Sequence, residues 1–467
     1  MNIFLQKQTK VPVYKQIYDY FRTEILNGNI KEGTKLPSIR QFASELHVSK
    51  NTVNEAFQQL MAEGYIESKQ KRGYWAVKIE GYVQEENSAK IVQMEGNREE
   101  EKWSIDFQYG DIDLMHFPTT VWKKHLAQSV DTLERDIMMY GEKQGYYPLR
   151  KEIARYLYAS RGIYCQPEQI IVGAGTQNNM RLIVSLFSEK PHIAMETPGY
   201  DGVKNVFEKE GCKLTPIPVD IDDGYCIKSL ENSCCNLAYV TPSHQFPLGM
   251  IMPITKRLSL LKWAQKHNAF IIEDDYDSEF RYEGAPIPSL KGLDTQERVI
   301  YVGTFSKSFL PAARVSYMVL PENLLTVYHA SQKESQQVSP IIQSALARFL
   351  ENGDFFRHLR KMRKVYEAKR MIIVESIHKY MGKQVEIIGE KAGLHILLFI
   401  EGKNPNRLRE QAKANKIKVY ATDNYYWANN QKEKARPILL GFGGLEKGEL
   451  ESGINLLAQI WFGNKKE

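Results

Sequence analysis

Cysteine is scarce in this sequence: five residues among 467, at positions 165, 212, 226, 234 and 235. The number is odd, Cys234 and Cys235 are adjacent, and none of the spacings matches a metal-binding pattern. An odd number does not fit a framework of paired cysteines, because each disulfide uses two. We therefore expect reduced thiols, as in a cytoplasmic protein.

Long apolar runs are also missing. No run approaches the roughly 18–20 residues that cross a bilayer, and residues 1–10 lack the apolar core of a signal peptide. These absences predict a cytoplasmic protein without a membrane partner. The length allows two or three domains, and the charged fraction of 25% is ordinary for a globular chain.

The excess of positive charge is small, with a net charge of +6, but it is unevenly distributed. Residues 1–79 hold 12 Lys+Arg and 7 Asp+Glu, a net charge of +5, and residues 80–104 hold 3 and 7, a net charge of −4. A basic head followed by an acidic linker suggests nucleic-acid binding. Charge alone does not decide this, because scattered surface charge would give similar totals.

The head, residues 1–79, has the residue pattern of three helices and a hairpin. Apolar residues recur every four positions in residues 13–25, and Gly28 ends the run. Ser38 and Gln41 form an S-x-x-Q sequence, which predicts a capping box before the second helix. Ser49 begins a third run with helical spacing, so the second and third helices form a helix-turn-helix.

The third helix presents polar residues that reach base edges and phosphates in other helix-turn-helix proteins. After it, "GYIESKQKRGYWAV" predicts two strands around a basic tip, a wing suited to phosphates. A small helical protein-interaction domain is the alternative. The segment from Pro12 to Ile66 resembles the winged-helix domain of GntR-family bacterial transcription regulators. The resemblance implies that DNA is contacted by Arg40, Ser49, Lys50, Asn51, Thr52, Asn54 and, in the wing, Lys71, Arg72 and Gly73.

From Ile105 onward, apolar strands alternate with amphipathic helices, which predicts an α/β body over residues 105–467. Four apolar runs end in polar clusters, and ligands of open α/β sheets gather beyond the carboxyl ends of strands. The clusters are "GAGTQ" at 173–177, "TPSHQFPLG" at 241–249, "EDDYDSEF" at 273–280 and "GTFSKS" at 303–308.

Each cluster alone is ambiguous; the acidic one, for example, would also suit a metal or a solvated turn. Together they specify pyridoxal phosphate, which needs an amine for a Schiff base, an acid for the ring nitrogen, a donor for O3′ and a phosphate cradle. Lys307 would supply the amine, Asp274 the acid and Tyr276 the donor. The cradle would comprise the helix start at Gly175, Thr176 and Gln177 with Thr304, Ser306 and Arg314.

The order of these motifs resembles fold-type I aminotransferases, whose large doubly wound sheet domain precedes a small C-terminal α+β domain. That resemblance adds Tyr200 as a residue stacked on the cofactor and Gln245 near O3′, where the family usually has asparagine. It also places the segment from Tyr140 to Leu157 near the active site and implies a homodimer. The combination of head and body is identified with the MocR subfamily of GntR regulators, which includes a similar GABA-sensing member.

The subfamily implies a transcription regulator that senses an amine-containing or B6-type effector through Lys307. Aminotransferases grip the substrate carboxylate with a late arginine, but Leu439 occupies that position here and Arg436 lies three residues earlier. Gly202 and approximately Asn424 stand where the GABA-sensing member has arginines. A simple amino acid is therefore a less suitable effector, since its carboxylate would lose a charge-assisted pair. Two alternatives remain: a working aminotransferase that carries a DNA-binding domain, and a head that acts alone while the cofactor is structural.

Overall fold

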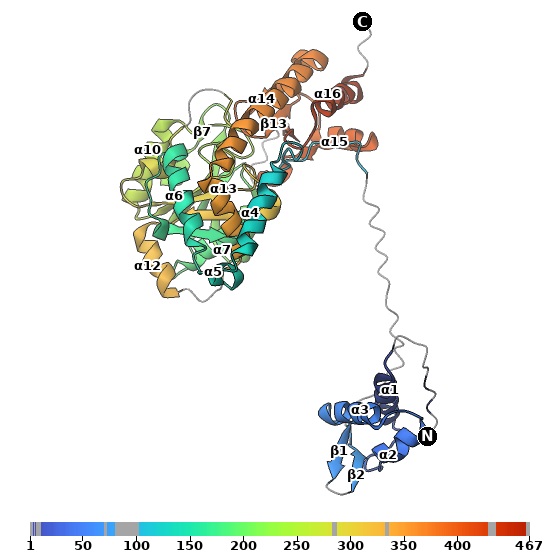
Figure 1. The fold of residues 1–467 in the computed structure, drawn as a ribbon. Coiled ribbons are helices and arrows are strands. Elements are labelled where there is room, and N and C mark those ends of the chain that lie inside the picture. The colour runs from blue at the N-terminus through green and yellow to red at the C-terminus, as the bar shows by residue number, and fades with distance from the viewer. Residues whose placement is uncertain are drawn as a thin grey trace. The chain divides into compact units, whose positions relative to one another are not determined.

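The protein is described from a computed structural model, in which the described residues are 3, 5, 11–69, 72–79, 102–282, 287–331, 336–427 and 436–463. The chain forms two compact units, residues 1–100 and 101–467 (Figure 1). The division falls within the predicted linker, of which residues 80–101 lie outside the described residues. Among the described residues, no helix combines the length and apolar character that crossing a bilayer requires.

The first unit contains three helices and a two-stranded antiparallel hairpin, as the sequence predicts. Its apolar stripes meet in one core, in which Phe21, Phe42 and Phe57 contact each other. The elements are α1 Val13–Leu26, α2 Ile39–Glu45, α3 Lys50–Ala62, β1 Ile66–Lys69 and β2 Gly73–Ala76.

The predicted capping box at α2 is only half formed. The Ser38 hydroxyl accepts a hydrogen bond from the Gln41 backbone amide at 3.2 Å. The Gln41 side chain, however, donates to Glu45 at 2.9 Å instead of reaching back to residue 38. Glutamine and glutamate four residues apart lie on the same helical face, and this pairing wins over the box.

The second unit is built around an eight-stranded sheet with the order β4-β11-β10-β9-β8-β5-β6-β7. The five strands from β10 to β6 are parallel, whereas β11 runs antiparallel to both of its neighbours and β7 is antiparallel to β6. The strands are β4 Ile170–Gly173, β5 His192–Thr197, β6 Lys213–Asp220, β7 Gly224–Tyr225, β8 Leu237–Val240, β9 Phe270–Asp275, β10 Val299–Thr304 and β11 Ser316–Val319.

Both faces of this sheet are buried. Ile170 and Tyr301 belong to one hydrophobic cluster, whereas their neighbours Ile171 and Ile300 belong to another. Successive residues of a strand point to opposite faces, so each face packs on its own layer of helices. The arrangement is the doubly wound α/β fold that the sequence predicts.

A smaller antiparallel sheet of order β12-β13-β16-β15 lies toward the C-terminus, and β14 pairs with β3 in parallel. The long helix α14 extends from α13 to α16 and joins the two parts (Figure 1). The strands are β3 Ile105–Asp106, β12 Glu386–Ile388, β13 His395–Phe399, β14 Ile417–Lys418, β15 Tyr420–Ala421 and β16 Ile438–Gly441.

The helices of this unit cover both sheets. They are α4 Thr119–Asp131, α5 Arg135–Met138, α6 Tyr147–Arg161, α7 Thr176–Ser185, α8 Asp201–Lys209, α9 Ile227–Glu231, α10 Ile254–Lys266, α11 Leu290–Leu293, α12 Glu322–Ser331, α13 Pro340–Glu351, α14 Asp354–Tyr380, α15 Pro405–Ala414 and α16 Lys447–Phe462.

Candidate functional site

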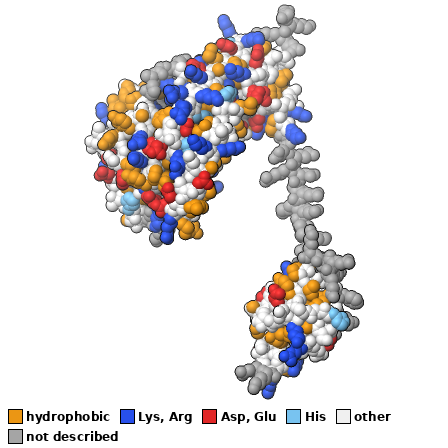
Figure 2. Space-filling model, in the orientation of Figure 1, with side chains coloured by type: hydrophobic (Ala, Val, Ile, Leu, Met, Phe, Trp, Pro, Cys, Tyr) orange, Lys and Arg blue, Asp and Glu red, His pale blue; other side chains and the backbone are white. Residues whose placement is uncertain are grey.

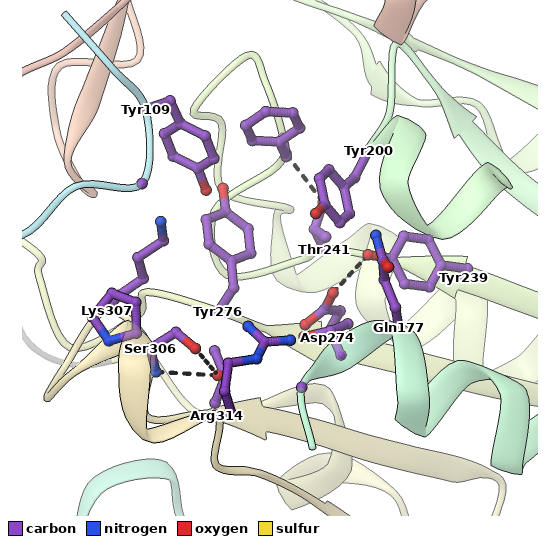
Figure 3. A pocket seen from close by; sticks show the side chains of 16 residues that line it. Tyr109, Gln177, Tyr200, Tyr239, Thr241, Asp274, Tyr276, Ser306, Lys307 and Arg314 are labelled. Carbon is purple, nitrogen blue, oxygen red and sulfur yellow. Dashed lines mark hydrogen bonds between the residues drawn. The ribbon is translucent and has the colours of Figure 1, made fainter. Parts of the chain in front are cut away.

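A cavity of about 330 Å³ lies where the strands β4, β8, β9 and β10 end. Parallel strands carry their carboxyl ends to one edge of the sheet, so residues far apart in the sequence meet there. Figure 3 shows the side chains of Lys307, Asp274, Tyr276, Ser306 and Arg314 around this space. The lining residues are Tyr109, Gly110, Gly175, Thr176, Gln177, Tyr200, Tyr239, Thr241, Phe246, Asp274, Tyr276, Thr304, Ser306, Lys307, Pro311 and Arg314.

Lys307 follows β10 and is the amine of the cavity. Its Nζ lies 4.5 Å from the centre of the Tyr109 ring, and a Cβ at Gly110 would come within 2.8 Å of it. Burial lowers the pKa of Lys307 from 10.5 to about 8, although Asp277 and Asp111 favour its charged form. A neutral lysine amine is a nucleophile, so this environment suits attack on a carbonyl carbon.

Asp274 lies on β9 beside Val302 of β10 in the sheet register. The Tyr239 hydroxyl donates a hydrogen bond to Asp274 Oδ2 at 2.6 Å. The other carboxylate oxygen, Oδ1, is buried and has no partner among the described residues. Burial raises the pKa of this carboxyl group to about 7. A buried acceptor without a donor is costly, so a ligand with an N–H group would complete it.

The other carboxylates of the acidic cluster are turned away from the cavity. Glu273 accepts hydrogen bonds from the backbone amides of Leu290 and Lys291 at 2.7 Å. Asp275 forms an ion pair with Arg161 at 2.7 Å. All three acidic side chains at 273–275 are buried, so the cluster is not a solvated turn. Only Asp274 of the three lines the cavity.

An anion cradle lies at the other end of the cavity. Gly175 has φ +98° and caps α7, whose first backbone amides are free of helical partners. A Cβ at Gly175 would lie 2.5 Å from Arg314 Nη2, so glycine lets the guanidinium approach the helix start. Thr304 and Ser306 are joined by a hydrogen bond of 3.0 Å and line the same space.

The two tyrosines that the sequence predicts for the site, Tyr200 and Tyr276, both line the cavity. The Tyr200 ring lies edge-on to Phe246 with centroids 5.7 Å apart. The Tyr276 hydroxyl donates to the backbone oxygen of His244 at 2.8 Å and lies 3.1 Å from His244 Nδ1. Tyr276 thus reaches the cavity wall, with its hydroxyl engaged by the 241–249 loop.

Gln245 does not line this cavity. Its amide donates to Pro198 O at 2.8 Å and Phe246 O at 2.7 Å, and its oxygen accepts from the Leu248 amide. The side chain therefore holds the loop together from behind, and its neighbour Phe246 is the loop residue that lines the cavity. The segment from Tyr140 to Leu157 also supplies no lining residue to the described cavity of this chain.

Several lining residues were not found from the sequence. Tyr109 and Gly110 lie in an irregular segment after β3 that has no motif. Tyr239 is an interior residue of β8 and looks like core in the sequence. Thr241 and Phe246 belong to the predicted polar cluster at 241–249. The position of this cluster at the end of a strand is the sequence signal that could have identified them as lining residues. Pro311 opens the 3-10 helix before Arg314.

Leu439 and Arg436 lie at or near the position where aminotransferases carry the arginine that binds the substrate carboxylate. Leu439 is buried in β16, opposite Leu397 and Tyr420. Arg436 Nη1 lies 3.1 Å from Asp423 Oδ1 and 3.2 Å from Asp423 O, and its guanidinium stacks on Tyr426.

Neither Gly202 nor Asn424 lines the cavity, and Asn424 lines a separate one near Tyr420. A Cβ at Gly202 would meet the Tyr200 ring at 2.6 Å, so a larger side chain there requires Tyr200 to move. Asn424 lies in the 3-10 helix Asp423–Tyr425, whose Tyr425 ring packs on Phe246.

The predicted DNA-contacting residues lie around α2, α3 and the hairpin. Ser49 caps α3 by accepting from the Thr52 amide at 3.1 Å, and Val53, Ala56, Phe57 and Leu60 bury the opposite helix face. Lys and Arg side chains gather on the side of this unit that carries the hairpin (Figure 2). Arg40, Ser49, Lys50, Asn51, Asn54, Arg72 and Gly73 are exposed, Thr52 is half-buried, and Lys71 lies outside the described residues.

The residues of the cavity fit pyridoxal phosphate. The partnerless oxygen of Asp274 suits a protonated ring nitrogen, Lys307 suits an aldehyde carbon, and the Gly175–Arg314 cradle suits a phosphate. All of these groups line the same cavity.

Each of the two units matches a known protein family. Residues 13–75 match the bacterial regulatory proteins of the gntR family, and residues 104–432 match aminotransferase class I and II. An uncharacterized HTH-type transcriptional regulator of Bacillus subtilis, YdeL, is 41% identical over 98% of both chains. The probable rhizopine catabolism regulatory protein MocR of Rhizobium meliloti is 33% identical over 97% of this chain and 95% of its own.

The body also resembles solved enzymes. An archaeal alanine:glyoxylate aminotransferase superposes with a TM-score of 0.70 and 26% identity, over 77% of this chain and 91% of that one. With a helix-turn-helix unit, a fold-type I aminotransferase domain and relatives that match over nearly the whole length, the chain belongs to the MocR-like subfamily of GntR-family HTH-type transcriptional regulators.

Proposed function

We propose that this regulator binds pyridoxal phosphate in the cavity and senses a small primary amine or a B6-type compound through Lys307. The observation that carries the proposal is the convergence of a half-buried amine of lowered pKa, a buried carboxylate oxygen without a partner among the described residues and an anion cradle. When bound, the cofactor supplies an aldehyde carbon that exchanges one primary amine for another.

The chain's own residues would hold the three ends of the cofactor. Asp274, fixed by Tyr239, would accept the N–H of the ring. The amides that open α7 and the Arg314 guanidinium would neutralise the phosphate. Tyr200 would cover the ring, and Lys307 would meet the aldehyde. Asp274 is buried, so a charged hydrogen bond to it would be stronger than one in water, whereas Arg314 is exposed.

The first unit supports the part of the proposal that concerns DNA binding. The exposed face of α3 and the basic hairpin supply base-edge and phosphate contacts. An effector changes DNA occupancy only by its different affinity for the two states of the protein. We propose that the amine that occupies the cavity sets this difference, and that the protein works in the cytoplasm on paired DNA half-sites.

A homodimer is part of the proposal. Leu114 and Met115 are 66% and 79% exposed, and Tyr140 is 82% exposed. We propose that these exposed apolar side chains are covered by the second copy. The Tyr140–Leu157 segment, which supplies nothing to the cavity of its own chain, is a candidate to complete the cavity of the second copy.

The residues at the position of the carboxylate-binding arginine limit the class of effector that we propose. Arg436 is held by Asp423, and Leu439 is buried. We therefore propose an amine whose recognition does not depend on a bidentate arginine of this chain at these positions. A B6 compound, a dipeptide, a sulfonate and an unusual amino acid all fit this description.

The test uses full-length protein. Purified protein incubated with pyridoxal phosphate should show the visible absorbance band of the bound cofactor, and Lys307→Ala should lose it. Lys204→Ala is the matched control, because Lys204 lies over Trp427 outside the cavity lining. DNA binding to the chain's own upstream region is then measured with a panel of amines. A protein that binds no B6 compound would refute the proposal.

The match to aminotransferase class I and II favours one alternative, an enzyme with a DNA-binding domain. Many turnovers with an amino donor and a keto acid would establish that alternative. Effector-dependent DNA binding without turnover supports the sensor. Unchanged DNA binding in Lys307→Ala, with every amine tested, would instead show that the head acts alone.

A further inference from the structure

Two histidines and an aspartate form a buried cluster outside the cavity lining. His244 follows β8, Asp277 follows β9 and His395 begins β13 of the smaller sheet, and all three are at most 2% exposed. Each residue offers one ligand-type atom, and these atoms lie within 4.8 Å of one another. None of the three lines the cavity, and the functions considered above use none of them.

Hydrogen bonds fix one nitrogen of each imidazole as a donor. His244 Nδ1 lies 2.9 and 3.0 Å from the two oxygens of Asp277, and His395 Nε2 lies 2.9 Å from Pro247 O. Carboxylate and carbonyl oxygens only accept, so both of these nitrogens carry a hydrogen. In a neutral imidazole the second nitrogen then keeps its lone pair, which leaves His244 Nε2 and His395 Nδ1 as acceptors.

Both of these acceptors are unsatisfied. His244 Nε2 and His395 Nδ1 are buried and have no hydrogen-bond partner in the described part of the chain. A buried acceptor without a donor is costly, so the pair suits a bound species. Histidines that bind a metal almost always donate their other ring N–H to a carboxylate, a backbone carbonyl or water. Here one histidine donates to a carboxylate and the other to a carbonyl.

The spacing of the two imidazole rings suits a single ion. Their centroids are 5.3 Å apart, with an angle of 45° between the ring planes. A zinc ion lies about 2.0–2.1 Å from an imidazole nitrogen, so two imidazoles at a tetrahedral angle around it have centroids about 5.2 Å apart. A water molecule would supply only hydrogen bonds, whereas a cation would also offset the negative charge of Asp277, which is 1% exposed.

The backbone of the smaller sheet closes tightly over the cluster. Gly393 has φ +74°, and a Cβ there would overlap His244 Cε1 and lie 2.7 Å from Asp277 Oδ2. The Gly393 amide donates to Phe280 O at 2.7 Å, and its carbonyl accepts from the Tyr282 hydroxyl at 2.7 Å. The cluster therefore lies where the smaller sheet meets the segments that follow β8 and β9.

Side chains of the cavity wall also contact the cluster. The Tyr276 hydroxyl lies 3.1 Å from His244 Nδ1. The rings of Tyr109 and Phe246 have their centroids 4.9 and 5.6 Å from that of His395. Since all three of these residues line the cavity, an ion held by the histidines would fix the wall of the cavity without occupying it.

We propose that His244, Asp277 and His395 bind one divalent first-row transition-metal ion, for which zinc is the probe. The free imidazole nitrogens supply lone pairs, and Asp277 supplies the negative charge. The ion joins the segments after β8 and β9 to β13, so it fastens the smaller sheet to the large one beside the cavity. This inference does not depend on which ligand the cavity binds.

The test uses full-length protein freed of cofactor and treated with a chelator. Zinc is titrated in competition with a chromophoric chelator, and the wild type should bind one ion per chain. His395→Gln and Asp277→Asn should each lower the zinc affinity at least about tenfold. Cobalt gives a direct readout of the ligands, because Co²⁺ bound by imidazoles absorbs in the visible range, and His395→Gln should lose this absorbance.

His125→Gln is the matched control. His125 is 3% exposed and lies 2.8 Å from Asp354. Among the described residues, no third ligand-type side chain completes that pair, so its loss should leave the zinc affinity unchanged. Zinc should also raise the midpoint of thermal unfolding of the wild type, and the rise should disappear in His395→Gln.

Two results of the titration would overturn the inference: a wild type that binds less than one zinc ion per chain, and equal zinc affinities in the wild type and His395→Gln. If the variants do not fold, the cobalt spectrum of the wild type decides. A thiolate-to-cobalt charge-transfer band would place the ion at cysteines and overturn the inference. Pyridoxal phosphate binding is measured separately, so its failure would refute the proposed function and leave this result unaffected.

Discussion

The Tyr239 hydroxyl donates to one oxygen of Asp274 at 2.6 Å and leaves the second oxygen buried, with no partner in the described part of the chain. The two side chains come from adjacent parallel strands, β8 and β9. The tyrosine therefore fixes the carboxylate while one acceptor stays available. If the ligand carries a protonated ring nitrogen, this second oxygen of Asp274 is the atom that recognises it.

Replacing Asp274 tests that selection. Asp274→Asn removes the charge that would stabilise a protonated ring, so the affinity for pyridoxal phosphate should fall about 10- to 100-fold, the loss of one charge-assisted hydrogen bond. Tyr239→Phe keeps the carboxylate and should cost less. Absorbance titration gives both constants, with Asp222→Asn on the surface as the control. Equal affinities in Asp274→Asn and wild type would contradict the assignment.

Gly175→Ala tests the phosphate cradle. The new Cβ would stand 2.5 Å from the Arg314 guanidinium, in a backbone conformation with φ +98° that alanine rarely adopts. Cofactor affinity should drop at least about tenfold. Gly211→Ala is the matched control, because Gly211 has φ +76° and nothing within 4 Å of the added atom. Both variants carry backbone strain, so a similar affinity loss in the two would show that the cradle is not the cause.

Lys307 should lower the stability of the unloaded protein at neutral pH. The unfolded chain keeps the lysine proton up to a pKa of 10.5, whereas the folded protein releases it near pH 8. Between these values the unfolded state binds more protons, so stability rises with pH across this window. Below pH 8 the penalty is complete and amounts to as much as about 3 kcal/mol.

The uncharged variant Lys307→Met removes this penalty. In urea unfolding without cofactor, it should be more stable than wild type at pH 7, and the advantage should shrink as the pH approaches 10. Lys204→Met, at a half-buried position, should show no such trend. A Lys307→Met protein that is less stable than wild type at pH 7 would show that the lysine is not strained by burial.

The DNA-binding unit makes a separate prediction. Asn51 lies on the exposed face of α3 and Arg72 on the hairpin. Asn51→Ala should reduce the preference for the specific site, by about 1–3 kcal/mol if one base contact is lost. Arg72→Ala should weaken binding to all DNA and reduce the salt slope by about one. Fluorescence anisotropy at several salt concentrations distinguishes the two, and identical effects on specific and random DNA would refute the assignment.

The sequence predicts most of the cavity because its key residues directly follow recognisable strands. Lys307, Asp274 and Gly175 lie at strand ends, where periodicity gives way to polar residues. Tyr239 could not be found in this way, since a tyrosine inside an apolar strand reads as core. Tyr109 could not be found either, because it reaches the cavity from an irregular segment after β3.

Gln245 shows a different limit. The sequence locates its loop correctly, but loop backbone decides which of two neighbours faces the ligand. Here the Gln245 amide group satisfies four polar groups of the loop and its surroundings, and Phe246 faces the cavity. The half-formed capping box at Ser38 has the same origin, since a competing partner, Glu45, is near in space.

The segment that carries Tyr109 and Gly110 against the Lys307 amine is continuous with the stretch of chain that leaves the DNA-binding unit, because both adjoin β3. Strand β3 is itself paired to β14 and not to the large sheet. A ligand in the cavity would therefore lie against the segment directly after β3, and its fit depends on how β14 holds that strand.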